Sequence, residues 1–199
     1  TLISVVSNAR PKIANYHFTT LSPNLGVVMA TEFLGYIVAD VPGLIKGAHQ
    51  GVGLGHSFLR HIERCKILVH LLDIAQTEER DFVQDYFDIR YELEFYRAEL
   101  LEKPEIVVGN KSDLLTPDML NERVRLFKEK TGKEILPISA ATSKGVDDLK
   151  RLVWNVIGDS ESFLNRLKVE EDLPLPVVEA IVYTAPEPEN FKVEKDSRG

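Results

Sequence analysis

The 199-residue chain is 44% hydrophobic, carries a formal net charge of −7 at pH 7 and contains one cysteine, Cys65. This composition supports one globular domain with a buried core and excludes an internal disulfide. No apolar run is long enough to span a bilayer, and the N-terminus lacks a signal-peptide pattern. We therefore expect a cytoplasmic protein with no membrane contact and, because it is acidic, no nonspecific binding of nucleic acid.

The charge is unevenly distributed. Residues 1–66 hold six basic and three acidic residues, so the acidic excess lies further along the chain. A positive N-terminal third would suit an anionic ligand. An ordinary solvated surface explains the same asymmetry equally well.

The first third of the chain predicts a helix end, a loop and a hairpin. Residues 1–9 are rich in apolar side chains and are followed by Pro11, which stops a helix. After a loop, Val27–Met29 and Tyr36–Ala39 predict two strands, and the connection between them favours a hairpin. The second strand runs directly into Asp40-Val41-Pro42-Gly43.

The next stretch begins with a glycine-rich loop. Five of the twelve glycines lie within Gly43–Gly55, which indicates a mobile loop with unusual backbone angles. A short helix should follow. Ile67–Leu72 then predicts a buried strand, in which His70 is interpreted as a hydrogen-bonded core residue and not as a ligand. A long helix is predicted from about Glu79 to Glu102, since its aromatic and aliphatic residues repeat every three or four positions.

Ile106–Val108 predicts another buried parallel strand, and it stops in the polar loop Asn110-Lys111-Ser112-Asp113. A fixed carboxylate can accept two hydrogen bonds from guanine, from the ring N1–H and from the exocyclic amine. Adenine presents an acceptor at that ring position, so the carboxylate would be left unpaired, which is how sites reach about 10⁴-fold discrimination. Asp113 would take this role. A polar turn that matches by chance is the competing interpretation.

The remaining elements continue the alternation of helix and strand. Thr116 and Pro117 predict the start of a helix that Gly132 ends. A strand over Glu134–Ile138 leads into Ser139-Ala140-Ala141, and a helix follows, with five apolar residues expected on its inner face: Leu149, Leu152, Val153, Val156 and Ile157. A last strand is predicted near Val177–Tyr183.

Three polar loops each follow an apolar strand directly, namely Asp40–Gly43, Asn110–Asp113 and Ser139–Ala141. We expect an α/β fold with a doubly wound, mostly parallel sheet and helices on both faces. In such sheets the carboxyl ends of neighbouring strands meet at one edge, where ligands bind. The three loops should therefore converge on one ligand.

The order of these loops resembles the switch II, guanine-recognition and base-supporting motifs of the GTPase superfamily. The resemblance narrows to the Obg family of ribosome-associated GTPases and covers residues 1 to about 167. Asn15–Leu21 with Pro23–Gly26 resembles its switch I, and Asp40–Ile45 with Gly47–His56 resembles its switch II. Phe58–Arg64 continues the match.

The resemblance implies ligands and roles. The ligand would be GTP or GDP with Mg²⁺, coordinated directly by Thr20 and through water by Asp40, while the Gly43 N–H would bond the γ-phosphate. The nucleotide-binding residues would be Phe18, Thr19, Thr20, Leu21, Ser22, Asp40, Val41, Pro42, Gly43, Asn110, Lys111, Ser112, Asp113, Ser139, Ala140 and Ala141. Hydrolysis would release the switch loops that the γ-phosphate and metal hold.

Two departures from the wider pattern affect this expectation. The phosphate-binding loop G-x-x-x-x-G-K-[ST] is missing, and Thr1 would follow it directly in the family, so the first strand is also expected to be absent. That absence should leave a gap between the strands that end at Asp40 and Asp73, and the chain alone should fold poorly and bind GTP very weakly. Leu44 stands where many GTPases place a water-orienting glutamine, a departure that the Obg family shares. No catalytic residue is therefore assigned, and hydrolysis should be slow.

We expect a GTPase domain over residues 1–168, and a linker with the beginning of a small C-terminal domain over 169–199. The implied function is a guanine-nucleotide switch that hydrolyses GTP and acts in assembly of the large ribosomal subunit, its partner. The alternative is a non-catalytic docking module derived from such a domain. An ATP-dependent kinase or ATPase is disfavoured by Asp113.

Overall fold

A six-stranded sheet forms the centre of the computed structural model, which describes residues 2–7, 24–30, 35–42, 62–77, 80–158 and 179–184. The strand order is β1-β2-β6-β3-β4-β5, and every adjacent pair except β1–β2 is parallel. The strands are β1 (Asn24–Met29), β2 (Gly35–Pro42), β3 (Ile67–Asp73), β4 (Glu105–Asn110), β5 (Leu136–Pro137) and β6 (Glu179–Thr184).

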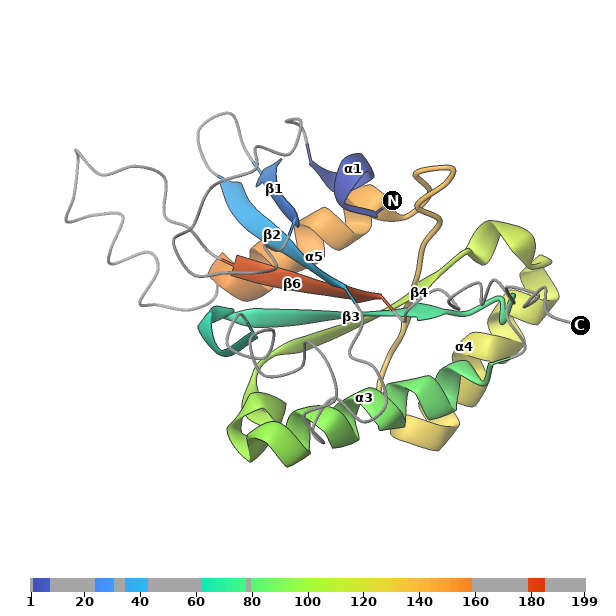
Figure 1. Ribbon diagram of the computed structural model, residues 1–199. Helices are drawn as coiled ribbons and strands as arrows, with labels where there is room; N and C mark the ends of the chain where they lie inside the picture. The colour runs from blue at the N-terminus through green and yellow to red at the C-terminus, as the bar shows by residue number, and fades with distance from the viewer. Residues whose placement is uncertain are drawn as a thin grey trace, which may run out of the picture.

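Helices cover both faces of this sheet (Figure 1). The helices are α1 (Leu2–Val6), α3 (Phe82–Tyr96), α4 (Pro117–Thr131) and α5 (Val146–Gly158). One buried cluster joins α1 and α5 to one face, and two others lie under α3 and α4 on the opposite face. The expected doubly wound α/β fold is thus confirmed. No helix in the described ranges is both long and apolar enough to cross a bilayer.

The central strands are apolar on both faces because both faces are covered. All residues of β3 except the last are buried, as are the four inner residues of β4. His70, in the middle of β3, is only 3% exposed and its Nδ1 lies 3.1 Å from Oε1 of Glu105. The prediction of a hydrogen-bonded core histidine is confirmed.

The predicted hairpin is present. Strands β1 and β2 pair antiparallel with Val28 opposite Tyr36, and β2 extends beyond its expected end through Asp40 to Pro42. The extension matters for the site, because it places Asp40 within the paired part of β2, two residues before the end of the strand.

β6 occupies the position between β2 and β3, parallel to both. Its Val182 lies opposite Asp40, and its Thr184 lies opposite Leu71. The gap expected between the strands ending at Asp40 and Asp73 is therefore filled by a strand from the C-terminal part of the chain. The proposed division at residue 168 stays a prediction, since residues 159–178 lie outside the described ranges.

The single long helix expected over residues 79–102 was wrong in its length. α3 begins after Asp81, whose side chain accepts hydrogen bonds from the N–H groups of Val83 and Gln84. It ends at Arg97, which is extended with φ −163° and ψ 114°, and a 3₁₀ turn, η2 (Ala98–Glu102), follows. This break lets Leu100 turn inward, where it is 2% exposed.

The last predicted elements fit with two corrections. α4 starts and stops where its signals predict: the hydroxyl of Thr116 accepts from the Met119 N–H at 3.4 Å, and Gly132 is left-handed with φ 69°. β5 is shorter than the predicted strand, however. Leu152, expected on the inner face of α5, is 39% exposed, because the buried stripe runs through Val146, Leu149, Val153 and Ile157.

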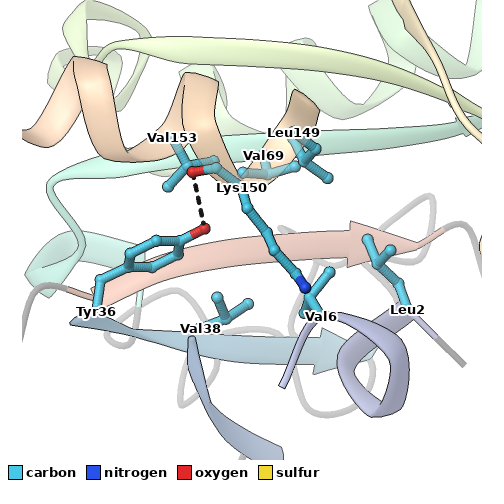
Figure 2. Close-up of a pocket in the computed structure, with 8 residues that line it drawn as sticks. All are labelled: Leu2, Val6, Tyr36, Val38, Val69, Leu149, Lys150 and Val153. Atoms are coloured by element: carbon cyan, nitrogen blue, oxygen red, sulfur yellow. Dashed lines mark hydrogen bonds between the residues drawn. The ribbon is translucent and has the colours of Figure 1, made fainter. Parts of the chain in front are cut away.

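A small hollow lies between α1, α5 and the sheet (Figure 2). It is lined mostly by aliphatic side chains, and the Tyr36 hydroxyl donates to the carbonyl oxygen of Lys150 at 3.3 Å beside it. Its volume of about 10 Å³ is at the lower limit for one water molecule. This hollow is a packing feature and not a ligand site.

Candidate functional site

Three strands carry polar residues at or near their carboxyl ends, toward one edge of the sheet. β3 and β4 are in parallel register with Asp73 opposite Asn110, and the N–H of Ile74 donates to the carbonyl oxygen of Asn110 at 3.1 Å. β2 runs in the same direction on the other side of β6, and Asp40 lies near its end. Asp73 and Asn110 therefore lie side by side. Asp40 lies toward the same edge but on the far side of β6, at the level of Val69, four residues before Asp73. The expected convergence is thus present as a shared edge of the sheet and not as a contact between Asp40 and Asn110.

The loops after β4 and β5 are bonded to each other. The Ile138 N–H donates to the carbonyl oxygen of Gly109 at 2.8 Å, and the Ser112 N–H donates to that of Ile138 at 3.0 Å. The side chain of Asn110 completes the contact, since its Oδ1 accepts from the Ala140 N–H at 2.9 Å. Two of the three predicted loops thus form one unit.

Gly109 permits this close packing. A Cβ at this position would lie 2.8 Å from Cδ1 of Ile74 and 3.2 Å from Cδ1 of Ile135. Ile74 is fully buried and has little room to shift. The absence of a side chain at Gly109 therefore lets β4 pack closely against Ile74, which follows β3, and against Ile135, which precedes β5.

The Ser139–Ala141 loop is held from inside. Ser139 is fully buried, its N–H donates to the carbonyl oxygen of Lys144 at 2.9 Å, and its hydroxyl accepts from the Thr142 N–H at 3.1 Å. Ala140 is 3% exposed, whereas Ala141 is exposed. Since the amides of Ser139 and Ala140 already bond within the protein, direct support of a base by this loop stays a prediction.

Lys111 has an unusual backbone and a fixed side chain. Its φ of 66° and ψ of 27° are left-handed, a conformation that costs a non-glycine residue energy and is often found at functional sites. Its Nζ lies 3.0 Å from Oδ2 of Asp73 and 2.7 Å from Oγ1 of Thr77. The side chain therefore crosses from the end of β4 to the end of β3.

Asp73 and Thr77 were not among the predicted site residues. Asp73 directly follows the apolar run of β3, as Asp40 follows the apolar run Tyr36–Ala39, and this shared sequence pattern was the signal that could have identified it. Burial alone would raise the pKa of Asp73. Hydrogen bonds from Thr77 and Lys111, together with the lysine charge, outweigh burial and lower that pKa, so the carboxylate stays ionised.

Asp113 lies in the 3₁₀ turn η3 (Ser112–Leu114), directly after Lys111. Ser112 is buried and anchors the turn, while Asp113 is exposed. Within the described part of the chain, no side chain donates a hydrogen bond to the Asp113 carboxylate. Its oxygens are thus available to accept from a ligand.

Asp40 is the predicted metal-site residue that the structure describes. Burial raises the pKa of its carboxyl group. A carboxylate oxygen is a ligand type that Mg²⁺ prefers, and a nearby cation would offset the cost of burying its charge, so this residue fits the expected ion. Across the described ranges, no group of three or more His, Cys, Asp or Glu residues could by itself hold a metal ion.

Several predicted positions lie outside the described residues. They are Phe18, Thr19, Thr20, Leu21, Ser22, Gly43 and Leu44. Val41 and Pro42 are described as the last residues of β2, next to Asp40. The structure therefore brings together the base-recognition half of the predicted site.

The parallel sheet and the bonded loops after β4 and β5 define the class of α/β nucleotide-binding domains. Residues 1–111 match a family model described as "50S ribosome-binding GTPase". The chain is 48% identical over 204 residues to GTPase Obg of Fervidobacterium nodosum, and 53% identical over 165 residues to GTPase Obg of Bacillus cereus. The chain belongs to this GTPase family, and within it to the Obg group.

The coverage of these matches is unequal. All of this chain aligns with the Fervidobacterium protein but only 46% of that protein is covered, and for the Bacillus cereus protein the shares are 82% and 38%. The chain thus spans less than half the length of these relatives. Among solved structures, a nucleolar GTP-binding protein 1 from Plasmodium falciparum has a TM-score of 0.56 at 15% identity, covering 84% of each chain. That likeness concerns the fold alone.

Proposed function

We propose that this chain is the nucleotide-recognition part of a GTP-hydrolysing switch that acts in the cytoplasm in assembly of the large ribosomal subunit. The observation that carries the proposal is the hydrogen bond from the Ala140 N–H to Oδ1 of Asn110, which joins two predicted loops into one unit. Membership of the Obg group supports it independently. The ribosomal role rests on the description of the family and on the resemblance of the motifs.

The proposed chemistry at the base is selective. Asp113 accepts from the N1–H and exocyclic amine of guanine, because its carboxylate is exposed and follows the fixed backbone of Lys111. The Asn110 side chain fixes the loop after β5 through its hydrogen bond from the Ala140 N–H. Adenine would leave the carboxylate unpaired, which disfavours ATP by several orders of magnitude.

The proposed chemistry at the phosphates is that of a slow switch. Mg²⁺, when bound, supplies charge neutralisation for the phosphates. Asp40 would hold it through water and Thr20 directly when the γ-phosphate is present. Leu44 has no group that can orient water, so hydrolysis by this protein should be slow without an activator.

Nucleotide binding by a full-length polypeptide that contains this chain tests the proposal. A fluorescent GDP analogue should bind in the presence of Mg²⁺ and be displaced by GTP and GDP but not by ATP. Displacement by ATP as effective as by GTP would contradict guanine recognition. Thr20→Ala should weaken GTP binding and spare GDP, whereas Thr19→Ala, the matched control, should not separate the two nucleotides.

The ribosomal part of the proposal needs its own measurement. Cosedimentation with large ribosomal subunits should be stronger with a non-hydrolysable GTP analogue than with GDP. Equal cosedimentation in both states, or none in either, would contradict a nucleotide-controlled role at the ribosome.

A further inference from the structure

The carboxylate of Asp73 is held in one orientation from several sides. Its Oδ1 accepts from the Ala75 N–H at 3.1 Å, and its Oδ2 accepts from the Thr77 N–H at 3.2 Å and from the Thr77 hydroxyl. The adjacent Ile74 N–H bonds the carbonyl oxygen of Asn110. The turn after β3 is therefore fastened to the end of β4 by its backbone, independently of any ion pair.

This fixed carboxylate and the Thr77 hydroxyl hold the ammonium group of Lys111 at 3.0 Å and 2.7 Å. The backbone end of Lys111 is fixed as well, by its left-handed conformation and by the bond from Ser112 to Ile138. With both ends held, the methylene chain of Lys111 runs from the end of β4 to the end of β3. These methylene groups are the apolar part of the residue that lies two positions before Asp113.

We propose that Asp73 and Thr77 are positioning residues for nucleotide binding, which set the Lys111 side chain as a preformed support for the purine ring. This inference rests on the proposed function, because it assumes a purine nucleotide at Asp113. Neither residue needs to touch the nucleotide. Their effect is transmitted through Lys111.

The partly exposed ion pair between Lys111 and Asp73 should matter more for nucleotide binding than for folding. The side chains of Lys111 and Asp73 are 40% and 23% exposed, and ion pairs this exposed contribute little to folding. A lysine side chain released from its partner gains rotamer freedom, and a ligand that packs on it must remove that freedom again. Loss of the anchor should therefore affect nucleotide binding more than folding.

The test is a double-mutant cycle in the full-length polypeptide, read as the dissociation rate of a fluorescent GDP analogue. Asp73→Asn and Thr77→Val should each accelerate dissociation, Asp73→Asn by about tenfold. GDP and GTP should be affected equally, because the contact concerns the base. In a Lys111→Met background, which keeps the aliphatic chain and removes the ammonium group, Asp73→Asn should change the rate less than twofold.

Controls separate the possible outcomes. Glu129→Gln removes an exposed carboxylate paired with Arg125 near the C-terminal end of α4 and should leave the rate unchanged. If the unsubstituted polypeptide binds no guanine nucleotide, the proposed function fails and this inference falls with it. If it binds, and Asp73→Asn has no effect or has the same effect in the Lys111→Met background, only the positioning role is overturned. Thr77 is exposed, so Thr77→Val provides a folded variant even if Asp73→Asn does not fold.

Discussion

Asn110 and Ala140 are thirty residues apart in the chain, yet Oδ1 of Asn110 accepts a hydrogen bond from the backbone N–H of Ala140 at 2.9 Å. Asn110 ends β4, and Ala140 lies in the loop that follows β5. The bond therefore fixes the distance between the two loops that the motif pattern assigns to one base. Asn110 therefore has a structural role in the site, because its side chain holds the loops after β4 and β5 together.

Asn110→Ala should lower the free energy of unfolding by about 1–3 kcal/mol, because the buried Ala140 N–H loses its acceptor. Asn110→Asp keeps an acceptor oxygen and should lose less. Urea unfolding at neutral pH measures both, with Asn121→Ala on the exposed side of α4 as the control. An equal loss for Asn110→Ala and Asn121→Ala would show that the bond is unimportant.

The sequence predicts the elements with strong local signals. Thr116, Pro117 and Gly132 mark the limits of α4 correctly, because caps and turns are determined by neighbouring residues. The alternation of apolar strands and helices likewise predicts the sheet and the edge at which Asp40 and Asn110 lie. These features can be predicted with little knowledge of tertiary contacts.

Long-range contacts explain what was missed. The break at Arg97 has no proline or glycine, and it is coupled to the burial of Leu100 and to an ion pair between Arg97 and Glu63. The placement of β6 between β2 and β3 depends on which strands are available to pair. Asp73 and Thr77 belong to no recognised motif, so their contact with Lys111 became evident only in three dimensions.

Because of the contacts of the Glu105 carboxylate, we expect the free energy of unfolding to depend on pH in the acid range. It lies 3.1 Å from Nδ1 of His70, and accepts from NH1 of Arg90 at 2.7 Å and from the Tyr86 hydroxyl at 3.3 Å. Burial alone would raise the pKa of Glu105, but these partners, His70 foremost, lower it. A lowered folded-state pKa stabilises the protein above the unfolded value of about 4.3, and this contribution is lost as the pH falls through the folded value.

Glu105→Gln should therefore lower the free energy of unfolding at pH 7 by about 3 kcal/mol, because it leaves Arg90 and its neighbours without their shared anion. The variant should also lose less stability than the parent between pH 5 and pH 3. Urea titrations across this range measure both effects. Glu129→Gln, at an exposed pair with Arg125, should change neither. A neutral result for Glu105→Gln would contradict the assigned role.

The charged form of Asp40 should lower the stability of the fold, whereas that of Glu105 raises it. Burial raises the pKa of its carboxyl group, so the charged form destabilises the ligand-free fold above that pKa, and the penalty disappears as the pH falls. Asp40→Asn should raise the ligand-free melting temperature by a few degrees at most, because solvent screens a partly exposed carboxylate. It should also weaken the Mg²⁺ dependence of GTP binding.

Thermal melts with and without GTP and Mg²⁺ measure both properties of Asp40→Asn. Asp148→Asn, at an exposed pair with Arg151 on α5, is the matched control. A lower melting temperature without ligand, together with unchanged Mg²⁺ dependence, would show that Asp40 serves the fold and not the ion.

Asp113 is proposed to recognise guanine by accepting hydrogen bonds from its N1–H and its exocyclic amine. Xanthine keeps the ring N1–H but replaces the exocyclic amine with a carbonyl oxygen, which would repel a carboxylate. An asparagine at this position can accept from N1–H and donate to that carbonyl, while its amide opposes the guanine amine.

The most direct measurement is competition between GTP and xanthosine triphosphate for full-length Asp113→Asn, with folding checked by thermal melt. The variant should lose GTP affinity by about two orders of magnitude and gain affinity for xanthosine triphosphate. Asp118→Asn, an exposed carboxylate in the first turn of α4, should leave the nucleotide preference unchanged. If folded Asp113→Asn still prefers GTP, Asp113 does not read the base and the account of this site is contradicted.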